Sequence, residues 1–482
     1  MKLKLIMVLT VSALLLTVWA CKDTFLDSSP QGQIVDSNYW KTEAEFQSGI
    51  NAAYFAMQWN ASGDSWQALA GMPTGDVRPN EDADYFNLEK LQFIPTNRYI
   101  NDEWSTLYLA VNRVNLVLSK LERASGLSTD VKNRLTGEAK FIRGFGYYML
   151  ARAWGDVPLI LTEQNAASPT DVPRTPVAQV FDQVSKDLTD AASLLPAKWD
   201  DANVGRATKG SALGYLAETF LYQKKWAEAA KAAESLFAIG SYALVKDYRK
   251  VFALENENNE ESVFEVQYRD SQLGWGASRN GHYFPTKQAP RGIGEKYVPM
   301  GGWGVQYPSK QVVAAFEKGD LRRKAIILAP GEQYYGFTMA DSLTPTGYTF
   351  TKYWVGPYKN DHSPLNLPQL RFSEVLLSYA ESLTELGRLP DAYIQLNKVR
   401  ARAGLSPLTP STKEKALDDI FQERRVETVA EYNQWFHLTR TGRAAAFVKK
   451  EYNRDLPAHE NLFPLPQSEL DANKALKQNP GY

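Results

Sequence analysis

The sequence predicts a protein dominated by α-helices, in which packed helix pairs support an irregular, loop-rich half with little β structure. Three observations predict this class: apolar residues recur at helical spacing, two segments repeat one pattern of small and large residues, and one stretch is crowded with glycine and proline. The chain has 482 residues, 44% of them apolar, and is therefore long enough to bury a large core.

Helical periodicity is clearest in the first third of the chain. Apolar or small residues recur every three or four positions over 107–121 and again over 135–153, which lines one face of a helix. Gly144 and Gly146 lie inside the second run, where each costs about 1 kcal/mol relative to alanine. We therefore expect a neighbouring helix to pack closely against these two glycines.

Two later segments share the residue spacing of tetratricopeptide repeats, which are pairs of antiparallel helices. Each has an alanine, large apolar residues at +3 and +9, a second alanine at +12 and another apolar residue at +19. The members are Ala217, Phe220, Trp226, Ala229 and Leu236, then Ala380, Leu383, Leu389, Ala392 and Val399. Gly387 suits the left-handed cap between the second pair. The alternative is a chance likeness between two ordinary helical hairpins.

The stretch 265–365 differs from the rest of the chain. It contains 13 glycines, 8 prolines and 16 aromatic residues, too many turn formers for long helices. Residues 263–268 alternate at a period of two, which predicts a short strand at its start. A loop-rich region of this length usually carries function.

The N-terminus has the pattern of an export signal. Lys2 and Lys4 precede a run of apolar or small residues over 5–20, which is too short to span a membrane comfortably. The single cysteine of the chain, Cys21, follows this run directly. This position predicts a lipidated first residue after cleavage of a signal peptide at 1–20. The alternative is an ordinary signal peptide with an incidental cysteine.

Composition and motifs exclude several function classes. The 54 basic and 55 acidic side chains nearly balance, so no nucleic acid partner is expected. The chain lacks the GxSxG, HExxH, Walker and GxGxxG motifs, and its four histidines have no metal-ligand spacing. We therefore expect no cofactor, no metal and no catalytic residue. Residues 80–84 resemble part of a calcium loop, but the required glycine and glutamate are missing, which favours a solvated acidic loop.

Aromatic residues beside polar or glycine residues on predicted loops are the candidate binding groups. A sugar has an apolar C–H face and a polar rim, so flat rings beside Arg, Asn and Asp suit it, and each stacked face contributes about 1–2 kcal/mol. These residues are Trp59, Trp66, Arg78, Asn80, Tyr85, Phe86, Trp275, Tyr283, Phe284 and Trp303. The alternative for any one of these rings is that it anchors its loop to the core.

Several segments, in order along nearly the whole chain, resemble the SusD/RagB family of nutrient-binding outer-membrane lipoproteins. The resembling residues are Cys21 with 25–27, then 39–43, 137–144, 153–159, 371–377 with 380–381, 423–427, 463–466 and 479–482. The resemblance implies one globular unit with a signal peptide at 1–20, an N-terminal helical region at 21–245 and a C-terminal region at 246–482. It also implies about four tetratricopeptide-like helix pairs.

The resemblance also implies a function. Members of this family capture oligosaccharides, or in some cases peptides, at the cell surface and serve a SusC-like TonB-dependent outer-membrane transporter. By their places in the chain, the candidate ligand-binding residues are Arg78, Asn80, Tyr85, Trp275, Tyr283 and Trp303, and Cys21 is the lipid anchor. We therefore expect a non-enzymatic glycan-binding lipoprotein of the outer membrane. The alternatives are a peptide receptor on the same scaffold, a surface glycan hydrolase, or a pure protein-interaction scaffold.

The charged stretch Glu423–Glu427 allows two interpretations. Arg424 and Glu427 stand three residues apart on a helix, and an exposed pair of this kind contributes only a few tenths of a kcal/mol. The family resemblance implies instead a partly buried charge network, in which removing one partner costs about 3–5 kcal/mol.

Overall fold

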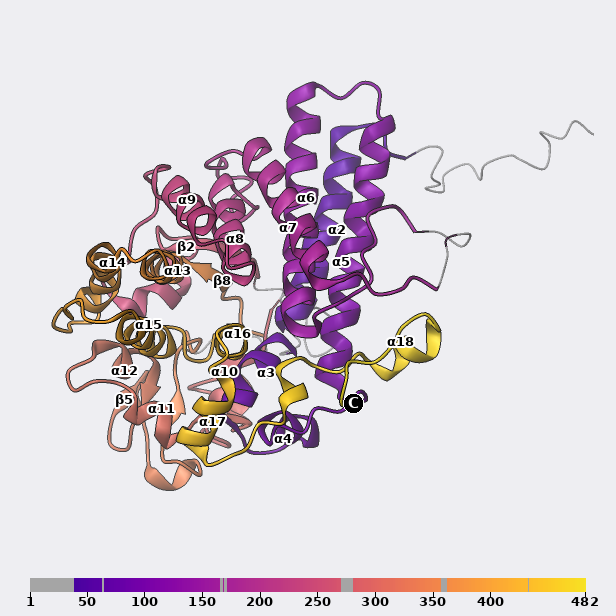
Figure 1. Cartoon of the computed structure of the whole chain (residues 1–482). Coiled ribbons are helices and arrows are strands. Elements are labelled where there is room, and N and C mark those ends of the chain that lie inside the picture. The colour runs from indigo at the N-terminus through magenta and orange to yellow at the C-terminus, as the bar shows by residue number, and fades with distance from the viewer. Residues whose placement is uncertain are drawn as a thin grey trace, which may run out of the picture.

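Helices make up most of the regular structure in this computed structural model, which describes residues 39–62, 65–164, 168, 171–269, 281–356, 362–431 and 433–482 (Figure 1). The long helices are α2 (Glu43–Ser62), α5 (Arg98–Arg123), α6 (Thr129–Trp154), α7 (Val177–Leu194), α8 (Lys209–Tyr222), α9 (Trp226–Phe237), α13 (Phe372–Glu385), α14 (Leu389–Arg402) and α15 (Lys413–Glu427). The short ones are α3 (Ser65–Gly71), α4 (Ala83–Glu89), α10 (Phe284–Gln288), α11 (Lys310–Ala314), α12 (Leu321–Ile326), α16 (Gln434–Arg440), α17 (Ala444–Tyr452) and α18 (Gln467–Ala472). The expected all-α-dominated class is confirmed.

The strands of the described residues are short and form antiparallel pairs. They are β1 (Val77–Pro79) with β3 (Gln306–Pro308), β2 (Ser262–Val266) with β8 (Leu367–Arg371), β4 (Ile327–Leu328) with β7 (Thr349–Phe350), and β5 (Gln333–Tyr334) with β6 (Phe337–Thr338). Single 3-10 turns lie at Met72–Thr74, Tyr248–Phe252, Leu254–Asn256, Pro299–Gly301, Asp341–Leu343 and Ala458–Asn461.

The long helices α2, α5, α6 and α7 stand together at one side of the molecule (Figure 1). α6 packs between α5 and α7 because it has no side chain at two contact points. A Cβ atom on Gly144 would lie 3.0 Å from Leu188 of α7, and one on Gly146 would lie 3.1 Å from Val111 of α5. The close helix approach expected at these glycines is confirmed.

The two segments with tetratricopeptide spacing form the helix pairs α8/α9 and α13/α14, and α9 also packs against α13. The alanines at the +12 positions, Ala229 and Ala392, are each 1% exposed, so they allow close helix contact. Gly387 adopts a φ of 77°, the left-handed conformation expected of the cap between α13 and α14.

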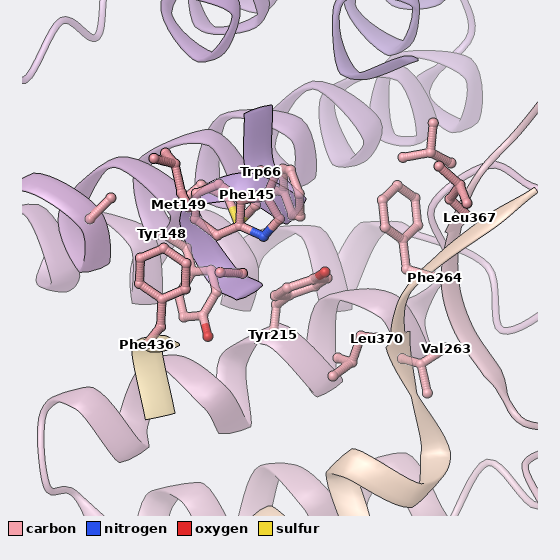
Figure 2. Packing of buried hydrophobic residues seen from close by; sticks show 14 of the residues in the cluster. Trp66, Phe145, Tyr148, Met149, Tyr215, Val263, Phe264, Leu367, Leu370 and Phe436 are labelled. Carbon is pink, nitrogen blue, oxygen red and sulfur yellow. The ribbon is translucent and has the colours of Figure 1, made fainter. Parts of the chain in front are cut away.

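The β2–β8 pair closes the base of the loop-rich stretch. β2 overlaps the predicted strand segment 263–268 but begins one residue earlier, at Ser262, and ends at Val266. Phe264 lies opposite Leu370 in the register. The two strands therefore bring together the beginning and the end of the region 265–365. Phe264 is buried against Phe141, Phe145 and Tyr215, so the base of the loop-rich half is part of the hydrophobic core (Figure 2).

Buried ion pairs attach the loop-rich half to α15. Arg322 of α12 lies 2.6 Å from Glu423 and 2.9 Å from Glu427, and the ammonium group of Lys352 lies 2.5 Å from Glu431. All five side chains are nearly or fully excluded from solvent. Each charge is therefore compensated by a partner from another segment, as buried charges must be.

The stretch Glu423–Glu427 is buried, as the charge-network interpretation requires. The pairing differs from the simple i,i+3 pattern, because Arg424 approaches Glu381 of α13 at 3.4 Å. Arg425 forms a separate pair with Asp76 at 2.7 Å.

The residues that bear on membrane attachment lie mostly outside the described part of the chain. Cys21 and the predicted signal peptide belong to the undescribed segment 1–38. Among the described residues, no helix is long and apolar enough to cross a membrane.

Candidate functional site

A short strand pair brings two distant candidate segments together. β1 and β3 are antiparallel, with Arg78 opposite Tyr307, and the backbone N–H of Asn80 donates to the carbonyl of Val305 at 2.9 Å. This register places the Arg78–Asn80 loop beside the residues that lead into β3, which include Trp303. The ladder thus joins two groups of candidates separated by more than 200 residues.

Trp303 is held by its backbone neighbours. Its N–H donates to the carbonyl of Thr286 at 2.7 Å, so the segment 302–305 runs along the end of α10. Gly302 has a φ of 79°, and a Cβ atom there would lie 2.2 Å from the carbonyl oxygen of Pro290. Gly304 has a φ of 62°. The flanking glycines are therefore required by left-handed backbone and by close approach of the chain.

Tyr283, Trp303 and His362 form a row of three rings. The Tyr283 and Trp303 rings stack with centroids 5.4 Å apart and planes 25° apart, and the Tyr283 and His362 rings lie 4.3 Å apart. Tyr283 and Trp303 are half-buried, whereas His362 is buried. We call these three residues the aromatic row. Stacking of this kind is a favoured arrangement of aromatic rings, and it leaves a ligand only the parts of Tyr283 and Trp303 that solvent reaches.

A backbone bridge sets the position of His362 in the row. His282 and Ser363 exchange two hydrogen bonds, at 3.2 and 2.8 Å, and this pairing holds the residues on either side in register. His282 itself is buried, and burial lowers its pKa to about 3, so its ring is neutral. The ring contacts Tyr268, Phe284 and Tyr353, so it anchors this backbone bridge as an uncharged group.

Polar residues lie on the two segments whose backbone is bonded to residues 302 and 305, on either side of Trp303. Asn80 is exposed, and the exposed side chains of Glu81 and Arg291 form an ion pair at 2.5 Å that links the loops before α4 and after α10. Such a surface pair contributes at most about 1 kcal/mol, so its groups are available to hydrogen-bond a ligand at little cost. Burial lowers the pKa of Lys287 on α10 to about 7.

Arg78 has a structural partner. Its guanidinium lies 2.7 Å from the carboxylate of Glu89, which also pairs with Arg454. Glu89 is buried, so this contact fixes the direction of the Arg78 side chain. Arg78 is therefore a cation of fixed orientation at the candidate site, and its side chain is 33% exposed.

Tyr85 is a correction to the expected set. Its ring is 1% exposed and stacks on Tyr99 at a centroid distance of 4.4 Å, and its hydroxyl accepts from Gln306 at 3.3 Å. Burial raises its pKa well above the ordinary value. A ring covered in this way belongs to the core and has no free face for a ligand.

Trp66 is also a core residue, stacked on Phe436 at 4.6 Å (Figure 2). The predicted acidic loop is engaged in local contacts: Asp82 caps α4, accepts from Tyr99 at 2.8 Å and pairs with Arg98. No group of three His, Cys, Asp or Glu side chains able to hold a metal occurs among the described residues.

Three residues named in the sequence analysis fall wholly or partly outside the described structure. Trp275 lies outside the described residues, as does Cys21, and the side chain of Trp59 is likewise not described. The described residue closest in sequence before Trp275 is Arg269, next to Tyr268, whose ring contacts His282 at 5.4 Å. Tyr268 also lines a pocket of about 500 Å³ between α2 and β2, together with Tyr54, Gln58 and Arg206.

Three residues near the candidate site are not among the predicted ligand-binding residues. The sequence marks His362 only as a histidine without metal-ligand spacing and Glu81 only as part of the acidic loop 80–84, and it does not single out Arg291. A usable indication for His362 was its position at the end of the aromatic-rich stretch 265–365. No local pattern identifies the Glu81–Arg291 pair, because its partners are 210 residues apart.

Comparisons with known proteins agree with this architecture. A family model described as "SusD family" matches residues 260–482, and a second, described as "Starch-binding associating with outer membrane", matches residues 24–221. A SusD-like protein of Bacteroides ovatus is 27% identical over 477 residues, covering 91% of this chain and 82% of that protein.

Solved structures agree as well. A laminarin binding SusD-like protein superposes with a TM-score of 0.79 at 26% identity, covering 92% of this chain and all of the other. Surface glycan-binding protein A from Bacteroides uniformis superposes with a TM-score of 0.78 at 25% identity, covering 91% of this chain and 99% of the other. Because both halves of the chain match this one family and the helical fold is shared over 92% of the chain, the chain belongs to the SusD-like family.

Proposed function

We propose that this protein is a cell-surface lipoprotein that binds oligosaccharides without cleaving them and passes them to a SusC-like TonB-dependent transporter. The observation that carries the proposal is the aromatic row Tyr283–Trp303–His362 on the loop-rich half. The names of two structural relatives, a laminarin binding SusD-like protein and a surface glycan-binding protein, support a carbohydrate ligand.

The chemistry of the surface suits a sugar. A sugar ring lays its C–H face on the accessible part of the Tyr283 and Trp303 rings, and each stacked face contributes about 1–2 kcal/mol. Asn80, Arg291 and Arg78 supply donors to hydroxyl groups at the rim. Two or three such contacts leave about 4–6 kcal/mol after ordering costs, which corresponds to roughly millimolar to tens of micromolar affinity. Trp275 remains a proposed member of the site.

Attachment and delivery are the finer parts of the proposal. Cys21 follows the apolar run of the predicted signal peptide, and lipidation there would anchor the chain to the outer membrane. The family description that names association with the outer membrane supports this location. A weakly held cargo suits a protein that must release it to a transporter.

The test is retardation of the purified protein in native gels that contain laminarin or soluble starch, together with an assay for released reducing ends. We expect retardation by at least one polysaccharide without release, and at least about fivefold weaker binding of Trp303→Ala. Trp199→Ala is the matched control, because Trp199 is a half-buried tryptophan in the loop between α7 and α8.

Each alternative predicts a different result in the same experiment. Release of reducing ends would indicate a surface hydrolase. Binding of peptides in place of polysaccharides would indicate a peptide receptor on this scaffold, and binding of neither would favour a pure interaction scaffold. Normal retardation of a folded Trp303→Ala variant would place the sugar site elsewhere.

A further inference from the structure

A second polar pocket lies among the helix pairs, away from the aromatic row. It has a volume of about 540 Å³ and is bounded by α8, α9, α13, α15 and α16. Its wall includes Trp226, Glu381, Phe421, Arg424, His437 and Arg440. This volume lies in the range of ligand-binding pockets. None of the residues that line it belongs to the aromatic row or to its polar rim.

The pocket carries an excess of positive charge. Four basic side chains line it, Lys224, Arg424, Arg440 and Arg443, against the two carboxylates Glu381 and Glu385. Ion pairs with residues outside the pocket do not change this balance, because Lys413 pairs with Glu385 and Asp418 pairs with Arg443. The lining of this partly enclosed space therefore has two more basic than acidic side chains, which favours an anionic ligand.

One buried carboxylate is shared by two guanidinium groups. Both oxygens of Glu381 accept from Arg440, at 2.7 and 2.8 Å, and one of them also lies 3.4 Å from Arg424. The Arg440 side chain is 5% exposed, yet its Nε has no hydrogen-bond partner in the described part of the chain. A buried guanidinium donor without an acceptor is costly, so the site lacks acceptor groups.

His437 shows the same shortage of acceptors. Its Nε2 lies 3.4 Å from Arg424, and its Nδ1 lies 3.3 Å from Arg440. Burial, reinforced by these two arginines and Arg152, lowers its pKa well below the ordinary value, so the ring is neutral. A neutral imidazole has one acceptor nitrogen, so it can accept from only one of the two guanidinium groups.

We propose that this pocket is an anion site that binds a carboxylate carried on an apolar group. The terminal nitrogens of Arg440 are held by Glu381. Its Nε, which has no acceptor, and the guanidinium of Arg424 beside it are the donors that a ligand carboxylate would use. The side chains of Leu221, Leu417 and Phe421 provide an apolar wall for the group that bears the charge. This chemistry fits either the C-terminal residue of a peptide or a free organic acid. The proposal does not depend on glycan binding.

The test measures binding of N-acetylphenylalanine to the full-length protein in detergent, by saturation-transfer NMR and titration calorimetry. The matched ligand is N-acetylphenylalaninamide, which has the same apolar group and no charge. We expect the amide to bind about tenfold more weakly, because it loses the charge-assisted hydrogen bonds.

Variants at the mouth of the pocket test its location without disturbing the buried pairs. Lys224→Gln combined with Arg443→Gln should weaken the acid about tenfold, because both cations line the pocket and keep contact with solvent. Arg388→Gln is the matched control, because Arg388 is an exposed arginine paired with Asp391 outside the pocket. Laminarin retardation should be the same in all three proteins, which separates this site from the sugar site.

The outcomes are distinct. Equal binding of acid and amide, unchanged binding by the double variant, or equally strong competition by inorganic phosphate would each overturn the proposal. Tighter binding of N-acetyl-Ala-Ala-Phe than of N-acetylphenylalanine would support it with a peptide chain end as ligand. Equal binding of these two acids would support it with a free organic acid as ligand.

Discussion

Tyr283 and Trp303 stack at a centroid distance of 5.4 Å although 20 residues separate them in the sequence. The stack depends on backbone contacts, since Trp303 is tied to Thr286 and the neighbouring His282 is bridged to Ser363. Rings held by the main chain on both sides are ordered before a ligand arrives, so binding need not bear that ordering cost.

The first prediction separates the ring of Tyr283 from its hydroxyl. If stacking provides the affinity, Tyr283→Phe should bind polysaccharide within about twofold of wild type, while Tyr283→Ala should bind at least about fivefold more weakly. Affinity electrophoresis measures both. A loss in Tyr283→Phe as large as that in Tyr283→Ala would mean that the hydroxyl, and not the ring face, makes the important contact.

The second prediction concerns the backbone that presents Trp303. In Gly302→Ala the added Cβ would meet the carbonyl of Pro290 at 2.2 Å in a backbone with positive φ. We expect a loss of stability of roughly 1–3 kcal/mol and weaker polysaccharide binding, because Trp303 must shift. Urea unfolding and gel retardation report the two effects.

The control for this change is Gly336→Ala. Gly336 also has a positive φ, of 75°, but no heavy atom lies within 4 Å of the added Cβ. This variant therefore has the backbone strain alone and should bind polysaccharide normally. Equal effects of the two substitutions on binding would show that close approach at Gly302 does not position Trp303.

Features with local causes could be predicted from the sequence. The helix pairs α8/α9 and α13/α14 follow from alanine and leucine spacing, and β2 follows from alternation of apolar residues. The helix contacts at Gly144 and Gly146 follow from the cost of glycine within a helix, which requires compensation.

Features with distant causes could not be predicted. Tyr85 looks like a loop ring in the sequence, but Gln306, 221 residues away, and the stacked ring of Tyr99 bury it. In the sequence, the glycines beside Trp303 indicate a ring without local cover. In the structure, glycine is required there because the backbone has a positive φ and packs closely against another part of the chain. His362 joins the row only through the non-local bridge to His282.

The third prediction compares two buried arginines. Arg371 lies 2.6 Å from Glu261, 2.7 Å from Glu427 and 2.8 Å from Glu431, so its loss removes one partner from each of three buried carboxylates. Arg371→Ala should therefore cost about 3–5 kcal/mol. Arg424→Ala should cost less, about 1–3 kcal/mol, because Glu381 retains Arg440. Urea unfolding gives both free energies.

The control for these variants is Arg388→Ala, which removes an exposed pair with Asp391 and should leave the unfolding free energy close to that of wild type. A cost for Arg424→Ala no larger than that of this control would favour the other interpretation of the stretch 423–427, a solvated face whose charges contribute little to stability. A larger cost for Arg424→Ala than for Arg371→Ala would contradict the order predicted from the partners.

The fourth prediction is a pH dependence caused by Glu374. Burial, with Glu431 nearby, raises the pKa of this carboxyl group to about 7, above its ordinary value of 4.5. The folded state then binds the proton more tightly than the unfolded chain does. This contribution to stability is complete below pH 4.5 and is lost as the pH rises to about 7.

Replacement of Glu374 by glutamine keeps the size of the side chain and the acceptor oxygen for Asn433, gives up the longer bond from the backbone N–H of Arg371, and removes the titration. Glu374→Gln should therefore show a flatter fall in unfolding free energy between pH 4.5 and 7 than wild type, as measured by urea midpoints. The exposed Glu295→Gln is the control and should follow wild type. Parallel curves for wild type and Glu374→Gln would show that this carboxyl group does not carry the effect.

The last prediction tests the lipid anchor at the single cysteine of the chain. The apolar run at 5–20 ends directly before Cys21. A thioether-linked lipid there would stabilise membrane attachment by about 0.8 kcal/mol for each methylene that it buries in the membrane. Cys21→Ala should therefore be recovered in the soluble fraction after cell lysis, whereas wild type should stay in the membrane fraction through a high-salt wash. Labelling with a fatty-acid analogue should mark wild type only. Salt removes proteins held by charge but not by acyl chains, so a Cys21→Ala protein that remains in the washed membrane would show that another contact anchors the chain.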